Sequence, residues 1–365
     1  MLGIEIDQKR IFGLDFLRAF AIFCVVRGHG IHLLSGTRLS FLTSIPFPHG
    51  VDIFFVLSGF LIGSSFLKYA ERQSGQVDWK KTLTFYARSA LRILPNYYAI
   101  LLVYCLLVNQ QIVPGNVHEF SLWYFITFTQ NLFTPFYNFY WESWSLPTQW
   151  WFYILFPLLL ALASSSRVSA RKATPWICLF FIVFSIVFRM QIADKAVDFF
   201  WWDAWVRKTV ASRCDNIYIG VLAAWVKLYA PDIWKRYSIP CLIAGLLLMV
   251  LSYILPRPIG SFYTNIVLMS VAPVAIALWL PFLSGITTHK TFLGDIVSHL
   301  SVLSYAMFLT NLMVVQIIDH NFAEFFSRMG AEGYLLYWVL VIIAAYLLYI
   351  LVEKPFILLR KRLSV

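Results

Sequence analysis

An arginine and a histidine lie inside the first long apolar run of the chain, Ile11 to Leu34. Arg18 and His29 are eleven residues apart, so in a helix both side chains return to nearly the same face, about 16 Å apart along the axis. Ionisable groups in a membrane span usually face a bundle interior or an aqueous cavity. A histidine titrates near neutral pH and can accept a proton from a hydroxyl group. The pair therefore indicates a buried functional site, unless His29 is a structural imidazole between its two glycine neighbours.

A carboxylate opens the second apolar run of the chain. Asp52 stands at its outer end, where the N-terminus of a helix favours a negative charge. The alternative is a partner role, either for His29 or for an arginine across the bundle. Gly59 and Gly63 follow with the spacing that lets two helices pack closely, so we assign this glycine pair to structure.

Two further arginines begin the third apolar run. Arg88 and Arg92 are four residues apart and therefore share one helical face. Their planar guanidinium groups suit the phosphates of a cofactor that enters from the cytoplasm. They would serve equally well to reach lipid phosphates at the membrane surface, and the sequence leaves these two roles balanced.

The composition of the chain shows which elements must carry these residues. Of the 365 residues, 60% are hydrophobic and only 13% are charged, too few charges to cover a soluble domain of this size. We expect an all-α, polytopic membrane protein with about ten transmembrane helices. Runs of about 20 apolar residues place them near 12–33, 50–68, 89–109, 144–163, 175–190, 210–229, 239–255, 262–283, 297–318 and 334–352.

The distribution of basic residues orients these ten spans. The segments on the side of both termini hold 17 lysines and arginines, and those on the other side hold 7. This bias predicts that both termini are cytoplasmic. Basic loops at an anionic membrane leaflet account for the net charge of +11, so we expect no nucleic-acid partner. The five cysteines lack the spacing of metal ligands, and we expect no metal.

Several motifs of this chain, in order, resemble acyltransferase family 3, a family of bacterial inner-membrane proteins that move acyl groups, often acetyl, onto carbohydrates. The resemblance covers essentially the whole chain. Its motifs are Arg18-x10-His29, His49 to Gly63, Arg88 and Arg92 before Pro95, Ser143 to Leu146 before Phe152-Tyr153, Ser212 to Asp215 before Gly220, Ser304-Tyr305, and Glu353 to Phe356.

The resemblance implies a role for each matched residue. His29 would be catalytic as a general base or transient acyl carrier, and Asp52 would orient it. Arg18, Arg88 and Arg92 would bind the donor, acetyl-CoA or another acyl-CoA. The residues expected to contact the acceptor sugar are Arg213, Asp215, Ser145, Gln149, Asn131 and Tyr305. Arg213 and Asp215 have a structural alternative, since they lie near the outer end of the 210–229 span as a possible salt-bridged pair.

Two positions depart from the pattern of the family. Gln149 stands where the family usually has a glutamate, and Asn311 stands where a histidine is common. Both changes keep a hydrogen-bonding group and remove a titratable one. Acid-base chemistry should therefore depend more strongly on His29 and Asp52. Glu142, seven residues before Gln149, would compensate only if its helix began early.

The segment from Ser121 to Trp141 is too short and interrupted for a confident span. It contains Asn131 and many aromatic residues, and we expect an outer or re-entrant element. Its aromatic side chains fit an ordinary interfacial belt, with a platform for a sugar or lipid-linked glycan as the alternative.

We expect a single membrane domain over residues 1–365, without the extracytoplasmic hydrolase-like domain that some family members carry. It would sit in the bacterial inner membrane and acylate an O-antigen, exopolysaccharide or similar glycan, directly or through a separate extracytoplasmic transferase. One rival is a proton-coupled transporter, which also places charged residues in its spans. Another is a catalytically reduced binding or accessory subunit, suggested by Gln149 and Asn311.

Overall fold

Helices account for every regular element in the computed structural model, which describes residues 10–118, 121–137, 139–289 and 291–362. Each of the ten expected apolar segments contains one long helix. These helices are α1 (Phe12–Gly30), α2 (Gly50–Arg72), α3 (Trp79–Asn109), α5 (Leu146–Ser165), α6 (Ala170–Gln191), α8 (Val210–Tyr229), α10 (Ser238–Ile254), α11 (Leu268–Leu283), α12 (Phe292–Asn321) and α14 (Ala331–Leu348).

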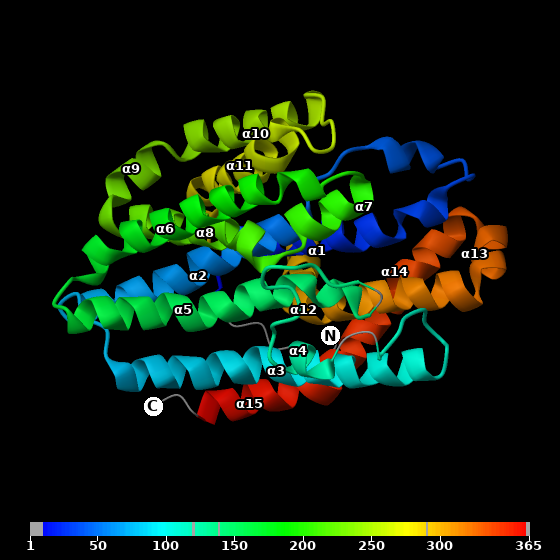
Figure 1. The fold of residues 1–365 in the computed structure, drawn as a ribbon, viewed down its shortest axis with the longest axis horizontal. Coiled ribbons are helices and arrows are strands. Elements are labelled where there is room, and N and C mark those ends of the chain that lie inside the picture. Colours follow the sequence, from blue (N-terminus) through cyan, green and yellow to red (C-terminus); the bar gives the residue numbers. More distant parts are fainter. Residues whose placement is uncertain (1–9, 119–120, 138, 290, 363–365) are drawn as a thin grey trace.

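Eight helical segments in the described part of the chain are long and apolar enough to cross a membrane. The prediction of an all-α polytopic membrane protein is therefore confirmed. The two remaining expected spans are α10, which has only 17 residues, and α8, which carries Arg213 and Asp215. Both run beside the other long helices of the bundle (Figure 1).

Short helices connect or extend the long ones. They are η1 (Ile31–Leu34), η2 (Ser40–Ser44), α4 (Leu122–Ile126), η3 (Trp141–Ser145), η4 (Ala193–Lys195), α7 (Phe199–Trp202), η5 (Asp203–Arg207), α9 (Pro231–Arg236), η6 (Tyr263–Val267), α13 (Ala323–Met329), η7 (Tyr349–Glu353) and α15 (Lys354–Arg362). In the described residues of the aromatic segment 121–141, the five-residue α4 is the only helix before η3 begins, as expected for an element that does not span the membrane.

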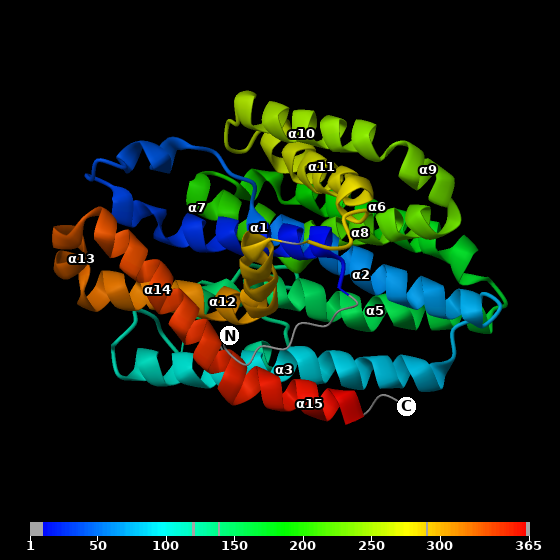
Figure 2. The same ribbon diagram turned by 180° about the vertical axis from the view of Figure 1, so that it is seen from behind.

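The long helices form layers around α1, α2 and α8. In Figure 1, α10 and α11 lie along one edge of the bundle, and α3 and α15 lie along the opposite edge. Figure 2 shows α14 crossing obliquely from α13 towards α15 on the other side of the molecule. Helix α3 begins at Trp79, ten residues before the expected start of its span, so Arg88 and Arg92 belong to the middle of a long helix.

Helices α2 and α8 meet backbone to backbone at two glycines. A Cβ atom added to Gly59 would lie 1.9 Å from the carbonyl oxygen of Ile217, and one added to Gly220 would lie 2.0 Å from that of Val56. The assignment of Gly59 to helix packing is thus confirmed. The glycines fix how close α2 and α8 come, and with it the positions of the polar residues on both helices.

Replacing Gly59 or Gly220 by alanine should destabilise the protein, because a methyl group cannot fit against a backbone carbonyl. The expected loss is about 1–3 kcal/mol or more, the range for overpacked cores, measured as the free energy of unfolding in detergent micelles. Gly28→Ala is the matched control, since nothing lies within 4 Å of its added Cβ. Equal stability of all three variants would contradict the packing argument.

Candidate active site

A cavity between α1, α2, α3, α5 and α12 brings together five of the eleven residues predicted to form the site. It contains about 640 Å³ of empty space, part of it open to solvent. We call it the inner cavity. Its lining residues include Arg18, Arg92, Ser145, Gln149 and Tyr305.

The charge of the inner cavity is positive. Arg18 and Arg92 both line it, and no carboxylate is among its described lining residues. Gln149 adds a neutral amide to the wall. Tyr305 donates its hydroxyl to the carbonyl oxygen of Ile93 at 3.0 Å, which fixes the ring. Two guanidinium groups without a competing acid suit an anionic ligand such as a phosphate.

The opposite wall of the inner cavity is apolar. Phe54 of α2 and Phe308 of α12 both line it and meet edge to face, with ring centroids 6.2 Å apart. Asn311 follows Phe308 by three residues, about one turn further along α12. Asn311, which forms a hydrogen bond with His29, therefore lies one helical turn from the Phe308 side of the inner cavity.

Asn311 holds His29 in one defined tautomer. Its side-chain NH₂ group donates to the carbonyl oxygens of Met307 and Phe308, at 2.9 and 2.8 Å. The amide oxygen is therefore the atom that faces His29 Nδ1, at 2.5 Å, and an oxygen can only accept. Nδ1 must carry the proton, so in the neutral imidazole the lone pair lies on Nε2. This arrangement leaves Nε2 as the basic atom of the site.

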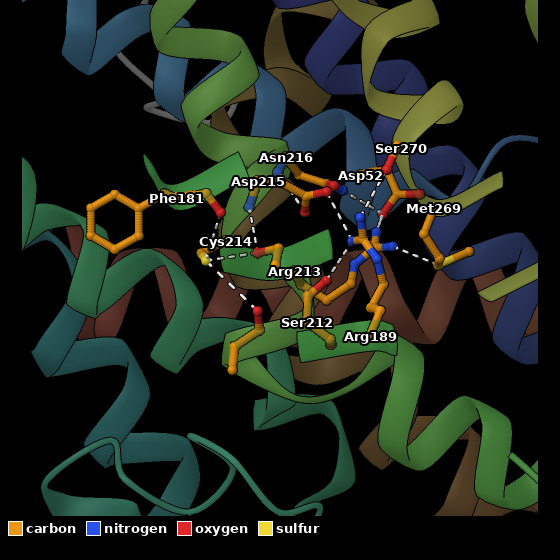
Figure 3. Close-up of polar contacts among 12 residues, drawn as sticks. Asp52, Phe181, Arg189, Ser212, Arg213, Cys214, Asp215, Asn216, Met269 and Ser270 are labelled. Atoms are coloured by element: carbon orange, nitrogen blue, oxygen red, sulfur yellow. Dashed lines mark hydrogen bonds and ion pairs between the residues drawn. The ribbon is translucent and has the colours of Figure 1, made fainter. Parts of the chain in front are cut away.

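Asp52 does not orient His29 as expected. Its carboxylate instead accepts hydrogen bonds from Arg213, with which it forms an ion pair, and from Asn216 Nδ2 at 3.2 Å (Figure 3). The sequence had offered an arginine across the bundle as one alternative partner for Asp52, and the structure has this arrangement. The orienting role towards His29 belongs to Asn311.

Asp215 forms the second ion pair of the same region, and its partner is Arg189 of α6 at 2.8 Å. Arg189 also donates to the carbonyl oxygen of Ser212 at 2.7 Å and to the hydroxyl of Ser270 at 2.8 Å (Figure 3). Arg213, Asp215 and Arg189 have no solvent-exposed surface. Arg213 and Asp215 therefore neither pair with each other nor line an open acceptor surface; they hold α8 against α2, α6 and α11.

A second group of charges lies between α7 and α8. Asp203 forms ion pairs with Arg207 at 2.6 Å and with Lys208 at 2.5 Å. Asn131, predicted to contact the acceptor, is fully buried and donates its side-chain amide to the carbonyl oxygens of Lys208 and Trp144, at 2.7 and 2.6 Å. In this structure Asn131 positions the backbone next to the charged group.

The pKa values in this group determine which of its side chains are charged at neutral pH. Burial lowers the pKa of Lys208 to about 8, against the opposing effect of Asp203. Burial would raise the pKa of Asp203, but Arg207 and Lys208 together hold it below its usual value. The proximity of Arg207 and the surrounding protein lower the pKa of His49 to about 4. At neutral pH, His49 is therefore neutral, and Asp203 is ionised beside two cations.

Sequence reasoning found some of these residues and missed others. Arg88 is half-buried on α3 and is not among the residues that line the inner cavity. Glu142 is buried in η3 and does not line it either. The sequence analysis does not single out Arg189, although its position at the end of the apolar run 175–190 is a signal of a buried partner. Asn311 was noted as a departure, without its link to His29.

Comparisons with known proteins bear on what this site does. A family model described as an acyltransferase domain matches residues 11–354. A candidate peptidoglycan O-acetyltransferase of Bacillus subtilis (strain 168) is 30% identical over 170 residues, which are 42% of this chain and 24% of the relative. A candidate O-acetyltransferase of Staphylococcus aureus (strain COL) is 30% identical over 169 residues, 42% and 25% of the two chains. The chain thus spans about a quarter of the length of the curated relatives it matches. No solved structure matches it.

The buried pair of Arg189 and Asp215 generates a stability prediction. Asp215→Asn should cost about 3–5 kcal/mol of unfolding free energy, because it leaves the Arg189 charge buried without a counter-ion. The double variant Arg189→Met/Asp215→Leu should recover most of this loss, since no unpaired charge remains. Thermal unfolding in detergent measures both.

An exposed ion pair supplies the control for this experiment. Glu324 and Arg328 are 3.3 Å apart with both side chains largely in solvent, and such pairs contribute little. Glu324→Gln should leave the unfolding temperature unchanged. If Asp215→Asn is as harmless as Glu324→Gln, the buried pair does not hold the helices together.

Proposed function

The chain belongs to the acyltransferase family whose model matches it, and from that premise we propose that it is a membrane O-acetyltransferase. The proposed reaction moves an acetyl group from acetyl-CoA on the cytoplasmic side to a hydroxyl group of a cell-envelope glycan. Both relatives are described as O-acetyltransferases, which favours acetyl as the acyl group. The bacterial inner membrane is the proposed location.

The observation that carries this proposal is the hydrogen bond between His29 Nδ1 and Asn311. It leaves the lone pair on Nε2, where a general base for a sugar hydroxyl needs it. In the proposed reaction, Nε2 accepts the hydroxyl proton while the sugar oxygen attacks the thioester carbonyl. The C–S bond then breaks, and the CoA thiolate receives the proton from the imidazolium. Atoms and charges balance without a metal.

The inner cavity supports the donor half of the proposal. Arg18 and Arg92 face it without a lining carboxylate, as the phosphates of an acyl-CoA require. Arg88 lies one turn before Arg92 on α3 and would extend the same positive face towards the cytoplasm. Gln149 and Ser145, also in the wall, would contact the bound groups by hydrogen bonds without exchanging protons.

The second half of the proposal concerns the acceptor, which would reach His29 from the extracytoplasmic side. The relative from Bacillus subtilis is described as acting on peptidoglycan, and a glycan of this kind is the proposed acceptor here. The acetyl group would reach it directly or through a separate extracytoplasmic transferase. Arg213, Asp215 and Asp52 would act on this half indirectly, by fixing α2 and α8.

Replacing His29 by alanine should abolish acetylation of the glycan, because the base is lost. The measurement is ester-linked acetate released by mild alkali from the cell-envelope glycan of cells that express each variant. His32→Ala is the matched control. His32 lies one turn further and forms a surface pair with Asp319 at 3.0 Å, so its loss should change acetylation by less than about twofold.

Two outcomes would contradict the role of His29. Unchanged acetylation in the His29→Ala variant would remove the residue from the reaction. Radioactivity that stays on the wild-type protein after incubation with labelled acetyl-CoA, and is absent from His29→Ala, would make His29 an acyl carrier instead of a base. A transporter, in contrast, would neither cleave the thioester nor take up the label.

Arg92→Gln should raise the KM for acetyl-CoA with little change in kcat. The expected increase is about 10- to 100-fold, because a hydrogen bond to a charged group contributes about 1.5–3 kcal/mol. Release of free CoA by the purified protein measures both constants. Arg72→Gln, in the last turn of α2, is the control and should leave KM unchanged. A fall in kcat at constant KM would assign Arg92 to another step.

A further inference from the structure

A second cavity lies at the other end of α3 from the connection that joins α2 to α3. It contains about 880 Å³ of empty space, part of it open to solvent, and we call it the outer cavity. Its walls come from the end of α3, the loop that follows, the start of η3 and the second half of α12. The lining residues are Tyr104, Pro114, Gly115, Asn116, Phe139, Tyr140, Trp141 and Gln316.

We propose that the outer cavity binds one uncharged pyranose unit of the acceptor glycan. This inference rests on the proposed function, which supplies a glycan as acceptor. It assigns a substrate class and a binding site that lie apart from the inner cavity and from His29. In the predicted topology the site faces the extracytoplasmic side, where such a glycan is found.

The lining of the outer cavity matches the chemistry of a sugar. Four of its side chains are aromatic, and Asn116 and Gln316 add amides that can both donate and accept hydrogen bonds. A pyranose ring presents C–H groups on its faces and hydroxyl groups around its edge, so it needs flat apolar surfaces and neutral polar groups together. None of the lining residues that the structure describes carries a formal charge, which favours a neutral sugar.

Tyr140 provides a buried hydroxyl group that forms no hydrogen bond with the described residues. The residue is fully buried, it lines the cavity, and its hydroxyl makes no hydrogen bond to any described residue. Buried hydroxyl groups nearly always have a partner, so a missing one calls for an explanation. The backbone of Tyr140 is also left-handed, with φ 42° and ψ 54°, a conformation that is uncommon for a bulky residue. A sugar hydroxyl would satisfy the Tyr140 oxygen.

Tyr104 and Gln316 fix the opposite wall. The Tyr104 hydroxyl donates to the side-chain oxygen of Gln316, which ties α3 to α12. The Gln316 NH₂ group remains for a ligand, because it donates to none of the residues that the structure describes. Asn116, Pro114 and Gly115 are exposed, so the cavity opens towards the loop side of the molecule.

Trp141 connects the outer cavity with the charged group near α8. The ammonium of Lys208 lies 4.0 Å from the centre of the Trp141 ring, a cation–π contact that holds the ring in place. Lys208 also pairs with Asp203, so the wall of the outer cavity is joined to the charged group around Asp203.

The sugar in the outer cavity is not the one that receives the acetyl group. Gln316 follows Asn311 by five residues on α12, which separates them by about 7.5 Å along the axis and about 140° around it. A unit bound at Gln316 would thus anchor the glycan while another unit of the same chain reaches His29. Oligosaccharides should bind more tightly than a monosaccharide.

Saturation-transfer NMR on the purified full-length protein in detergent tests this inference. The uncharged probes are chitotetraose and cellotetraose, N-acetylglucosamine is the short probe, and tetragalacturonate is the charged one. The variants are Trp141→Ala and, in case that protein fails to fold, Gln316→Leu. Trp123→Ala is the matched control, since Trp123 of α4 is 65% exposed and does not line the cavity.

The expected result is binding of at least one uncharged tetrasaccharide to the wild type and to Trp123→Ala. Trp141→Ala and Gln316→Leu should bind it at least about tenfold more weakly, with a loss of the preference for the tetrasaccharide over the monosaccharide. A single gel-filtration peak in detergent and an unfolding temperature equal to that of the wild type show that each variant is folded, and release of free CoA from acetyl-CoA is measured separately as the test of the transferase.

Three results would overturn the inference. One is unchanged tetrasaccharide binding in folded Trp141→Ala and Gln316→Leu. Another is a wild-type preparation that cleaves acetyl-CoA but binds neither uncharged tetrasaccharide. The third is tighter binding of tetragalacturonate than of the uncharged probes. Absence of thioester cleavage with intact, cavity-dependent sugar binding would instead count against the proposed transferase and leave the sugar site standing.

Discussion

Two buried ion pairs fix how the central helices of this molecule pack. Arg213 with Asp52 and Arg189 with Asp215 join α8 to α2 and α6, and a hydrogen bond from Arg189 adds α11. In a low-dielectric interior, a charge that loses its partner is costly, so the helices cannot separate without exposing one. The site on α1 and α12 depends on these ion-paired helices, because α2 contributes to the wall of the inner cavity.

Charges in this protein divide into two kinds. Those of α8 and its neighbours are paired with opposite charges and buried, as structural charges must be. Arg18 and Arg92 instead face the inner cavity, where none of the described lining residues is acidic. An arginine in such a place has its binding capacity available for a ligand. Burial combined with pairing thus separates the helix-holding arginines from those that face the cavity better than position along the chain does.

The sequence predicted the elements well and the pairings poorly. Long apolar runs located the helices because membrane spans need about 20 apolar residues. The eleven-residue spacing placed Arg18 and His29 on one face, and the structure puts Arg18 in a cavity that ends one turn from the partner of His29. The contacts of Asp52 with Arg213 and of His29 with Asn311 join positions 161 and 282 residues apart. No local pattern contains such contacts, since they depend on which helices become neighbours.

The close contact of α2 and α8 at Gly59 and Gly220 has a mechanical consequence. Two backbones in direct contact, cross-linked by a buried ion pair, cannot slide or tilt independently, so they behave as one rigid unit. Phe54 belongs to this unit, whereas Phe308 belongs to α12. In the proposed reaction, these two rings would border the path of the acyl group from the arginines to His29. The α2–α8 unit would then form the rigid wall of that path.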